Sequence, residues 1–280
     1  MKAARFDYER PKSLSEAVAL LQQSPGSAMA LAGGQSLVPM MNLGIIEPDM
    51  IVDLSGLRDL RRVEQERDRL FIGATVTHAE IEDGRLPDTT LGMVRHVAAC
   101  IGSRGIRNRG TIGGNLAHGD PAADWSAALL ALGAVAQVVG TTGRRTVPVA
   151  DFLRDPFTTA LRPDELLEGV VVPTLSRHAR WSYYRVRRAA NASPDAIGAV
   201  VIDPERGFCR TVLSGRRQIP RDLPVLAGRL AGVDGAPSTS KFDPGLASEV
   251  VARSGFGGDP IEAQIYATVL SRAIKRAMEK

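Results

Sequence analysis

Two glycine-rich stretches hold the residues of this chain whose types and spacing could do chemistry. The first, Ala32-Gly33-Gly34-Gln35-Ser36, follows the short apolar run Ala28–Leu31, which predicts a buried strand. Adjacent glycines at a strand end let the backbone bend sharply and let another group approach it closely. Bare backbone N–H groups in such a turn bind anions, and Ser36 adds a hydroxyl. The stretch predicts a phosphate-binding turn, although many Gly-Gly pairs are ordinary turns.

A second glycine-rich stretch follows between Arg107 and Asp124. It contains two adjacent glycines and two short polar residues, which are Thr111, Gly113, Gly114 and Asn115. A diphosphate would be repelled by Asp120 and Asp124, whereas a ribose or a ring N–H would donate to their carboxylates. If the two stretches face each other, they would bind one dinucleotide between them. Asp124 could instead be a helix N-terminal charge, and Asp120 could belong to an ordinary turn.

The other polar residues near these stretches have more than one possible role. Arg107 and Arg109 could neutralise phosphates, or they could be surface charges or partner contacts. Of the four histidines, only His118 lies in a candidate site. No lysine follows the first glycine pair and GxGxxG is absent, which disfavours a kinase and a Rossmann-type dehydrogenase. No catalytic triad or carboxylate pair is evident, so we predict no catalytic residue and a redox cofactor that carries the chemistry.

The composition narrows the class of protein. The chain has 280 residues, enough for two domains, and its net charge of +4 comes from arginines spread along the sequence. Nucleic-acid-binding proteins more often show a basic stripe with interleaved aromatics, so no nucleic acid partner is expected. Cys100 and Cys209 are far apart and form no CxxC motif, so we predict no iron–sulfur cluster, zinc or other metal site. Scattered cysteines suit the cytoplasm, and neither a signal peptide nor a transmembrane segment is expected.

Local patterns predict the elements that position the two stretches. Capping boxes at Ser13–Glu16 and Thr77–Glu80 predict helix starts. Apolar runs predict strands at Ala28–Leu31, Ile51–Leu54, Leu70–Ala74 and Leu166–Val172, and a hairpin of Ala134–Val139 with Arg145–Val149. Helices are expected over Leu91–Ile101 and Asp124–Leu132. We expect Arg107–Pro121 to be a structureless loop, because long loops of this kind usually serve a function.

The C-terminal part has a different character. We expect Asp151–Asp164 to be irregular, Pro173–Ala179 to be a linker and Ala231–Gly245 to be a loop. Three apolar runs predict an antiparallel sheet, and they are Trp181–Arg187, Ile197–Ile202 and Phe208–Leu213. Asp259-Pro260-Ile261-Glu262 predicts the start of the last helix, with Asp at the N-cap and Pro in the first turn.

Several motifs, taken in order, resemble the FAD-binding medium subunit of the molybdenum hydroxylases, the carbon monoxide dehydrogenase and xanthine dehydrogenase family. They are Ala32–Leu37, Pro48 with Ile51–Leu54, Ile72–Ala74 with His78, Arg107–Asn115 and Asp120–Asp124. The resemblance implies an α+β fold. A PCMH-type, vanillyl-alcohol-oxidase-like FAD-binding domain of two α/β subdomains would precede a smaller C-terminal α+β domain with an antiparallel sheet and helices. The FAD-binding domain would span residues 1–175, with subdomains at about 1–58 and 59–175, and the C-terminal domain 176–280.

The resemblance also implies which residues bind FAD. The first loop would bind the FAD pyrophosphate through Ala32, Gly33, Gly34, Gln35, Ser36 and Leu37. The second would line the cofactor through Thr111, Gly114, Asn115, Ala117 and His118. Asp124 would bond a polar part of FAD, and Leu167 and Arg185 match residues near the flavin ring. The family commonly has a Gly-Asp-aromatic stretch beside the flavin, but here Arg187–Ala196 has no aromatic, and Tyr183 and Tyr184 are candidates to cover that face.

The activity that the resemblance implies is electron transfer within an oxidoreductase. A large molybdopterin-containing subunit would oxidise the substrate, and a small subunit with [2Fe–2S] clusters would pass electrons to the FAD of this chain and on to an external acceptor. The complex would be a dimer of heterotrimers. Two alternatives stay open at this stage: a stand-alone FAD-dependent oxidoreductase using NAD(P)H, and a non-enzymatic flavin-nucleotide-binding module. Substrate and acceptor are not encoded in any motif of this chain.

Overall fold

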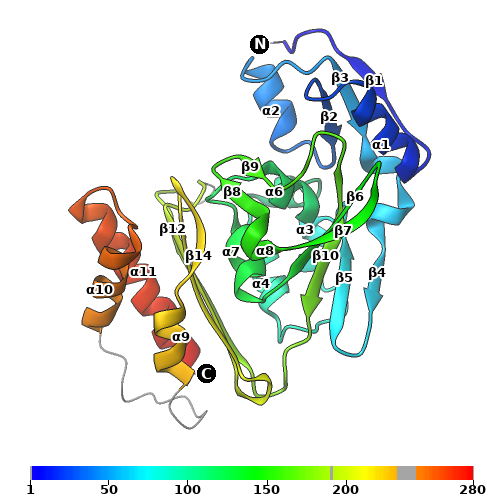
Figure 1. The fold of residues 1–280 in the computed structure, drawn as a ribbon. Coiled ribbons are helices and arrows are strands. Elements are labelled where there is room, and N and C mark those ends of the chain that lie inside the picture. Colours follow the sequence, from blue (N-terminus) through cyan, green and yellow to red (C-terminus); the bar gives the residue numbers. More distant parts are fainter. Residues whose placement is uncertain (1, 190–191, 232–243, 280) are drawn as a thin grey trace.

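The computed structural model of the protein describes residues 2–189, 192–231 and 244–279. The chain forms a small N-terminal unit, a larger central unit and a C-terminal sheet covered by helices (Figure 1). This mixture of parallel and antiparallel sheets with helices confirms the expected α+β class. No helix of the described residues is both long and apolar enough to cross a membrane.

The N-terminal unit is a parallel three-stranded sheet with two helices. Its strands lie in the order β1 (Asp7–Glu9), β3 (Met50–Asp53) and β2 (Ala28–Leu31), and its helices are α1 (Leu14–Gln23) and α2 (Leu37–Asn42). The Ser13 hydroxyl caps α1 as expected, accepting from the Glu16 N–H. The second half of the predicted capping box, a bond from the Ser13 N–H to the Glu16 carboxylate, is wrong, because this carboxylate accepts from the Lys12 N–H instead.

The central unit is an antiparallel sheet with helices packed on it. The strand order is β4 (Val63–Gln65), β5 (Arg69–Gly73), β10 (Leu166–Pro173), β6 (Val135–Gly140) and β7 (Gly143–Pro148). The helices are α3 (His78–Glu82), α4 (Met93–Cys100), α5 (Arg104–Arg107), α6 (Ile112–His118), α7 (Asp124–Ala131) and α8 (Val149–Phe152). A two-stranded ribbon, β8 (Leu153–Asp155) with β9 (Thr158–Thr159), replaces part of the irregular segment that was expected. The Thr77 capping box at α3 is confirmed.

The C-terminal part is an antiparallel sheet with helices on one face, as expected. Its strands run in chain order: β11 (Arg180–Val186), β12 (Ala196–Asp203), β13 (Phe208–Gly215) and β14 (Gln218–Asp222). The helices are α9 (Pro224–Ala231), α10 (Pro244–Ser254) and α11 (Pro260–Met278). Asp259 caps α11 as expected, and its carboxylate accepts from two N–H groups of the first turn. The loop expected at Ala231–Gly245 falls, between 232 and 243, outside the described residues.

The strand β12 is buried along its whole length because both of its faces are covered. Ile197, Ala199 and Val201 join the core of the central unit, whereas Val200 and Ile202 join the core beneath α9–α11. This alternation follows from the two-residue period of a strand. Helix α7 lies between the two larger units, packed against β12, β13 and β14 (Figure 1). The first residue of α7 is Asp124, so the packing of this helix positions one predicted site residue.

Candidate functional site

The first glycine-rich stretch forms the connection between β2 and α2. Gly34 has a φ of +71°, a left-handed conformation that glycine adopts without strain. Gly33 is a point of close approach, because a Cβ there would lie 2.1 Å from the carbonyl oxygen of Arg109. Ser36 begins α2 but makes no capping hydrogen bond with its side chain. The helix therefore does not use the hydroxyl that the sequence assigns to the ligand.

The second stretch is more regular than predicted. The expectation of one structureless loop over Arg107–Pro121 is wrong, because α6 lies within it and α5 ends at its first residue. Thr111 caps α6, since its Oγ1 accepts from the Gly114 N–H at 3.0 Å, and Gly119 ends the helix with a φ of +70°. A threonine N-cap and a glycine after the last turn are sequence signals for a helix. Gly113 and Gly114 mask these signals because glycine disfavours the helix interior.

The two stretches lie directly against each other. Besides the contact at Gly33, a Cβ on Gly114 would lie 3.3 Å from the Ala32 Cβ. The connection between α5 and α6 is held from its other side by His78, whose backbone N–H donates to the Gly110 carbonyl at 2.9 Å. The starts of α2 and α6 are thereby brought together, and the two stretches are neighbours as expected; a dinucleotide bound between them stays a prediction.

Asp124 and Arg185, two further predicted residues, form a buried ion pair. Arg185 donates to Asp124 Oδ1 at 2.8 Å, and the Tyr183 hydroxyl donates to the same oxygen at 2.6 Å. Arg185 also donates to the backbone carbonyl of Cys100. Burial raises the pKa of the Asp124 carboxyl, and the Arg185 guanidinium opposes that shift. Asp124 does lie at a helix N-terminus, as the alternative assignment predicted, but its carboxylate also accepts hydrogen bonds from Tyr183 and Arg185 of β11. The Tyr183 side chain is buried in this cluster and packs in the core.

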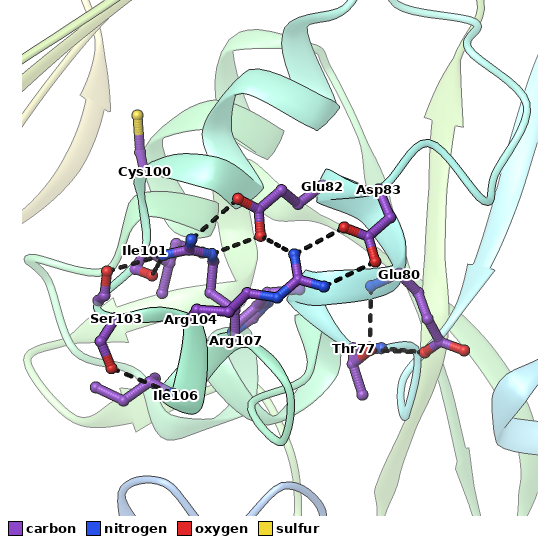
Figure 2. A network of polar contacts seen from close by, with 12 residues as sticks. Thr77, Glu80, Glu82, Asp83, Cys100, Ile101, Ser103, Arg104, Ile106 and Arg107 are labelled. Atoms are coloured by element: carbon purple, nitrogen blue, oxygen red, sulfur yellow. Dashed lines mark hydrogen bonds and ion pairs between the residues drawn. The ribbon is translucent and has the colours of Figure 1, made fainter.

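Figure 2 shows the acidic end of α3 paired with two arginines of α5. Arg107 donates to both carboxylate oxygens of Glu82, at 2.7 and 2.9 Å, and to two backbone carbonyls of the turn after α4. Arg104 donates to Glu82 and to both oxygens of Asp83. A phosphate-binding role for Arg107 is therefore wrong, because its guanidinium is committed to this network. Sequence reasoning missed the network, since the acidic and basic residues come from separate helices.

A cleft of about 380 Å³ opens beside the contact of the two stretches. Ala32, Gly33 and Thr111 line it next to charged residues from the surrounding elements, which are Arg61, Glu80, Asp83, Arg85, Arg104 and Arg109. Arg109 is exposed and makes no ion pair with any described residue. The cleft therefore includes only some of the predicted site residues. Of the arginines that line it, Arg109 is the one without a carboxylate partner among the described residues, so its charge is available to a ligand.

The remaining predicted residues lie toward the far end of α6 and under it. The ring of His118 lies 5.3 Å from that of Phe157, edge to face, and Ala117 is half-buried beside it. Leu167 belongs to the core on β10, the strand on which α6 packs. The Leu167 side chain is buried among apolar neighbours in this core.

His78 lies behind the second stretch and is buried. The indole N–H of Trp125 donates to His78 Nδ1 at 3.1 Å, which assigns the neutral ring with its proton on Nε2. Burial lowers the pKa of His78 from 6.5 to about 3, and the nearby charge of Arg107 acts in the same direction. The ring is therefore a neutral hydrogen-bond acceptor throughout the physiological range.

We expect acid to destabilise the fold through His78. The unfolded chain binds a proton at His78 below pH 6.5, whereas the folded chain does so only near pH 3, so the free energy of unfolding falls as the pH is lowered through this window. Between pH 7.5 and 5 the loss is about 2 kcal/mol. Urea unfolding of wild type and His78→Gln at pH 7.5 and 5 measures it. If the free energy of unfolding depends on pH equally in the two proteins, the lowered pKa is not that of His78.

Comparison with known proteins places the chain in a family. Residues 4–175 match the family model for the FAD binding domain in molybdopterin dehydrogenase. The chain belongs to this family. It is 32% identical over 278 residues to the carbon monoxide dehydrogenase medium chain of Afipia carboxidovorans, which covers 97% of this chain and 96% of that one. It is 30% identical over 288 aligned residues to caffeine dehydrogenase subunit beta of a Pseudomonas species, which covers 100% of this chain and 97% of that subunit.

A solved structure supports the same conclusion. The carbon monoxide dehydrogenase of Hydrogenophaga pseudoflava that lacks the Mo-pyranopterin moiety of its cofactor matches with a TM-score of 0.88 and 28% identity, covering 100% of this chain and 99% of the matched chain. The resemblance read from the motifs is confirmed. The protein is an FAD-containing medium subunit of the molybdenum hydroxylase type, and its relatives are subunits of oxidoreductases.

The residues that are present fit FAD. The Asn115 side-chain oxygen is buried and has no hydrogen-bond partner among the described residues. A buried acceptor without a donor is costly, and FAD carries hydroxyl and ring N–H donors that would satisfy it. Where the two stretches meet, a Cβ on Gly33 would lie 2.1 Å from the Arg109 carbonyl oxygen and a Cβ on Gly114 would lie 3.3 Å from the Ala32 Cβ, so both positions need glycine's small size. Together these features make a binding surface that matches a flavin nucleotide.

Proposed function

We propose that this chain is the electron-transfer subunit of a molybdenum-containing hydroxylase or dehydrogenase. It would take electrons from [2Fe–2S] clusters of a partner subunit and deliver them to an external acceptor. FAD, when bound, exchanges electrons singly or in pairs, which suits a relay between one-electron clusters and other acceptors. The observation that carries the proposal is the contact between the two glycine-rich stretches at Gly33, together with the buried, unpaired Asn115 oxygen of α6, one residue after Gly114.

The proposed FAD site joins both stretches to the cluster at α7. The residues assigned to it are Ala32, Gly33, Gly34, Gln35, Ser36, Leu37, Thr111, Gly114, Asn115, Ala117, His118, Asp124, Leu167 and Arg185. Backbone N–H groups of the first stretch would bind the pyrophosphate, because the glycines leave that backbone open. The ion pair between Asp124 and Arg185 would hold the start of α7 in place beside the cofactor. Leu167 would contribute through its backbone.

The proposal includes the assembly. Relatives named medium chain and subunit beta support a place in a multi-subunit complex. We infer a small [2Fe–2S] subunit and a large molybdopterin-containing subunit as partners, in a dimer of heterotrimers. The FAD-binding domain would end near residue 175. A cytoplasmic location is also part of the proposal, and it rests on two separated cysteines that are both free.

We expect the protein, purified with any subunits that accompany it, to carry a flavin absorbance that acid or heat releases as FAD. The bound flavin should be reduced by light with an electron donor and reoxidised by a quinone dye. The isolated chain should turn over little NAD(P)H, which separates it from a stand-alone oxidoreductase. A colourless preparation that takes up no added FAD would refute the proposal, and binding without redox cycling would favour a nucleotide-binding module.

A further inference from the structure

The turn between β8 and β9 contains a strained residue. Phe157 has a φ of +58°, and among the described residues only Leu91 is another non-glycine residue with a positive φ. The turn runs Asp155-Pro156-Phe157-Thr158, and its ends pair as the last residue of β8 and the first of β9. A turn with proline second and a left-handed residue third has the pattern of type II, where glycine or asparagine is favoured at the third position. A phenylalanine there is disfavoured by the local sequence rules.

The end of α6 holds this turn in place. The Phe157 N–H donates to the Gly119 carbonyl at 2.7 Å. Gly119 has itself a left-handed φ, and a Cβ on it would lie 3.1 Å from the Phe157 Cα. The two left-handed residues are therefore packed backbone to backbone. The position of Phe157 is fixed relative to α6, the helix that Thr111 caps and that ends at His118.

The strained turn places a large apolar side chain in solvent. Phe157 is 61% exposed, and its main ring contact is the edge-to-face packing on His118. Core packing does not explain this residue, and neither does turn propensity, since both would favour another residue here. Backbone strain that the surrounding structure maintains is typical of ligand-binding positions. A flat apolar ring held beside a ligand-binding helix is suited to stacking on another flat ring.

We propose that Phe157 stacks on an aromatic ring of the bound FAD, with His118 packed against its edge. The inference rests on the proposed function and extends it to a residue that no motif indicated. FAD offers two flat ring systems, the isoalloxazine and the adenine, and either would be recognised by the same stacking chemistry. The strain at Phe157 is then a cost that ligand stacking offsets.

Replacing Phe157 with glycine tests the proposal. FAD titrated into the flavin-free full chain, with any subunits that co-purify, should bind roughly tenfold more weakly. The thermal midpoint should stay level or rise, because glycine adopts the left-handed turn without strain. Leu91→Gly is the matched control: it also replaces an exposed left-handed residue, and its FAD affinity should equal that of wild type.

A second variant separates the flat ring from mere bulk. Phe157→Leu keeps an apolar side chain without a flat ring and should lose affinity similarly, whereas Phe157→Tyr should keep it. A changed visible flavin spectrum in the Phe157→Leu complex would assign the isoalloxazine, and lower affinity with an unchanged spectrum would assign the adenine. Wild-type affinity in both Phe157→Gly and Phe157→Leu would overturn the stacking while leaving the proposed function intact. A wild-type chain that binds no FAD would overturn both.

Discussion

Gly33→Ala is expected to abolish FAD binding and to leave the rest of the fold in place. The added Cβ would lie 2.1 Å from the Arg109 carbonyl oxygen and 2.8 Å from the Gly110 Cα. Both are backbone atoms, so no rotamer change relieves the clash. The two stretches must separate, at a cost of about 1–3 kcal/mol, and the surface that they form together is lost. The flavin absorbance of the purified variant, compared with its thermal unfolding, measures the two effects.

Gly105→Ala is the matched control for this variant. Gly105 lies in α5, where an added Cβ meets only the Ser103 hydroxyl, at 3.8 Å. The same methyl group should there be tolerated or stabilise the helix by about 0.5–1 kcal/mol, with FAD retained. If Gly33→Ala keeps its flavin as Gly105→Ala does, the cofactor does not depend on the contact between the two stretches.

Asp124→Ala is expected to destabilise the protein by about 3–5 kcal/mol, because it removes one partner of a buried charged cluster. The Arg185 side chain is only 11% exposed, and it would lose its carboxylate in an environment that solvates it poorly. The Tyr183 hydroxyl would lose its acceptor at the same time. Urea unfolding monitored by circular dichroism gives the change in the free energy of unfolding.

An exposed ion pair provides the comparison for Asp124→Ala. Glu249 pairs with Arg253 at 2.8 Å on the surface of α10. Glu249→Ala should change the stability by no more than about 0.5 kcal/mol, since solvent screens such pairs. A double variant, Asp124→Leu with Arg185→Met, should recover much of the loss, because it leaves no buried charge unpaired. If Asp124→Ala costs no more than Glu249→Ala, the buried pair is not formed in solution.

Local patterns predicted most of the elements that position the site. The strand before Gly33, the caps at Ser13 and Thr77 and the C-terminal sheet depend on residues close in sequence, and the structure has them. The prediction that the strand before Gly33 is buried is wrong, because Met29 and Ala30 are exposed and its end residues are only half-buried. Helix α6 escaped prediction because its glycines oppose the helix signals of Thr111 and Gly119. The glycines are needed for close approach between segments, a tertiary requirement that overrides local propensity.

The partners of charged residues were harder to predict than the residues themselves. Asp124 and Arg185 were both expected near the cofactor, but their pairing depends on how β11 packs beside α7. Arg107 pairs with Glu82 only because α3 and α5 meet in the fold. That contact is not visible in the sequence, where a phosphate contact was therefore a possible role for Arg107. No sequence pattern indicated a role for Phe157, since a phenylalanine in the sequence does not show that its φ is positive. Long-range packing decides each of these cases.

The burial of β12 on both faces affects how the molecule unfolds. Its side chains belong alternately to the core around α7 and to the core beneath α11. The backbone amides of β12 can exchange with solvent only after one of these layers has lifted away, which makes them members of the most persistent cooperative unit. A chain divided near residue 175 would expose a broad apolar surface on each piece. That position divides the sequence, while the core around α7 contains residues from both sides of it.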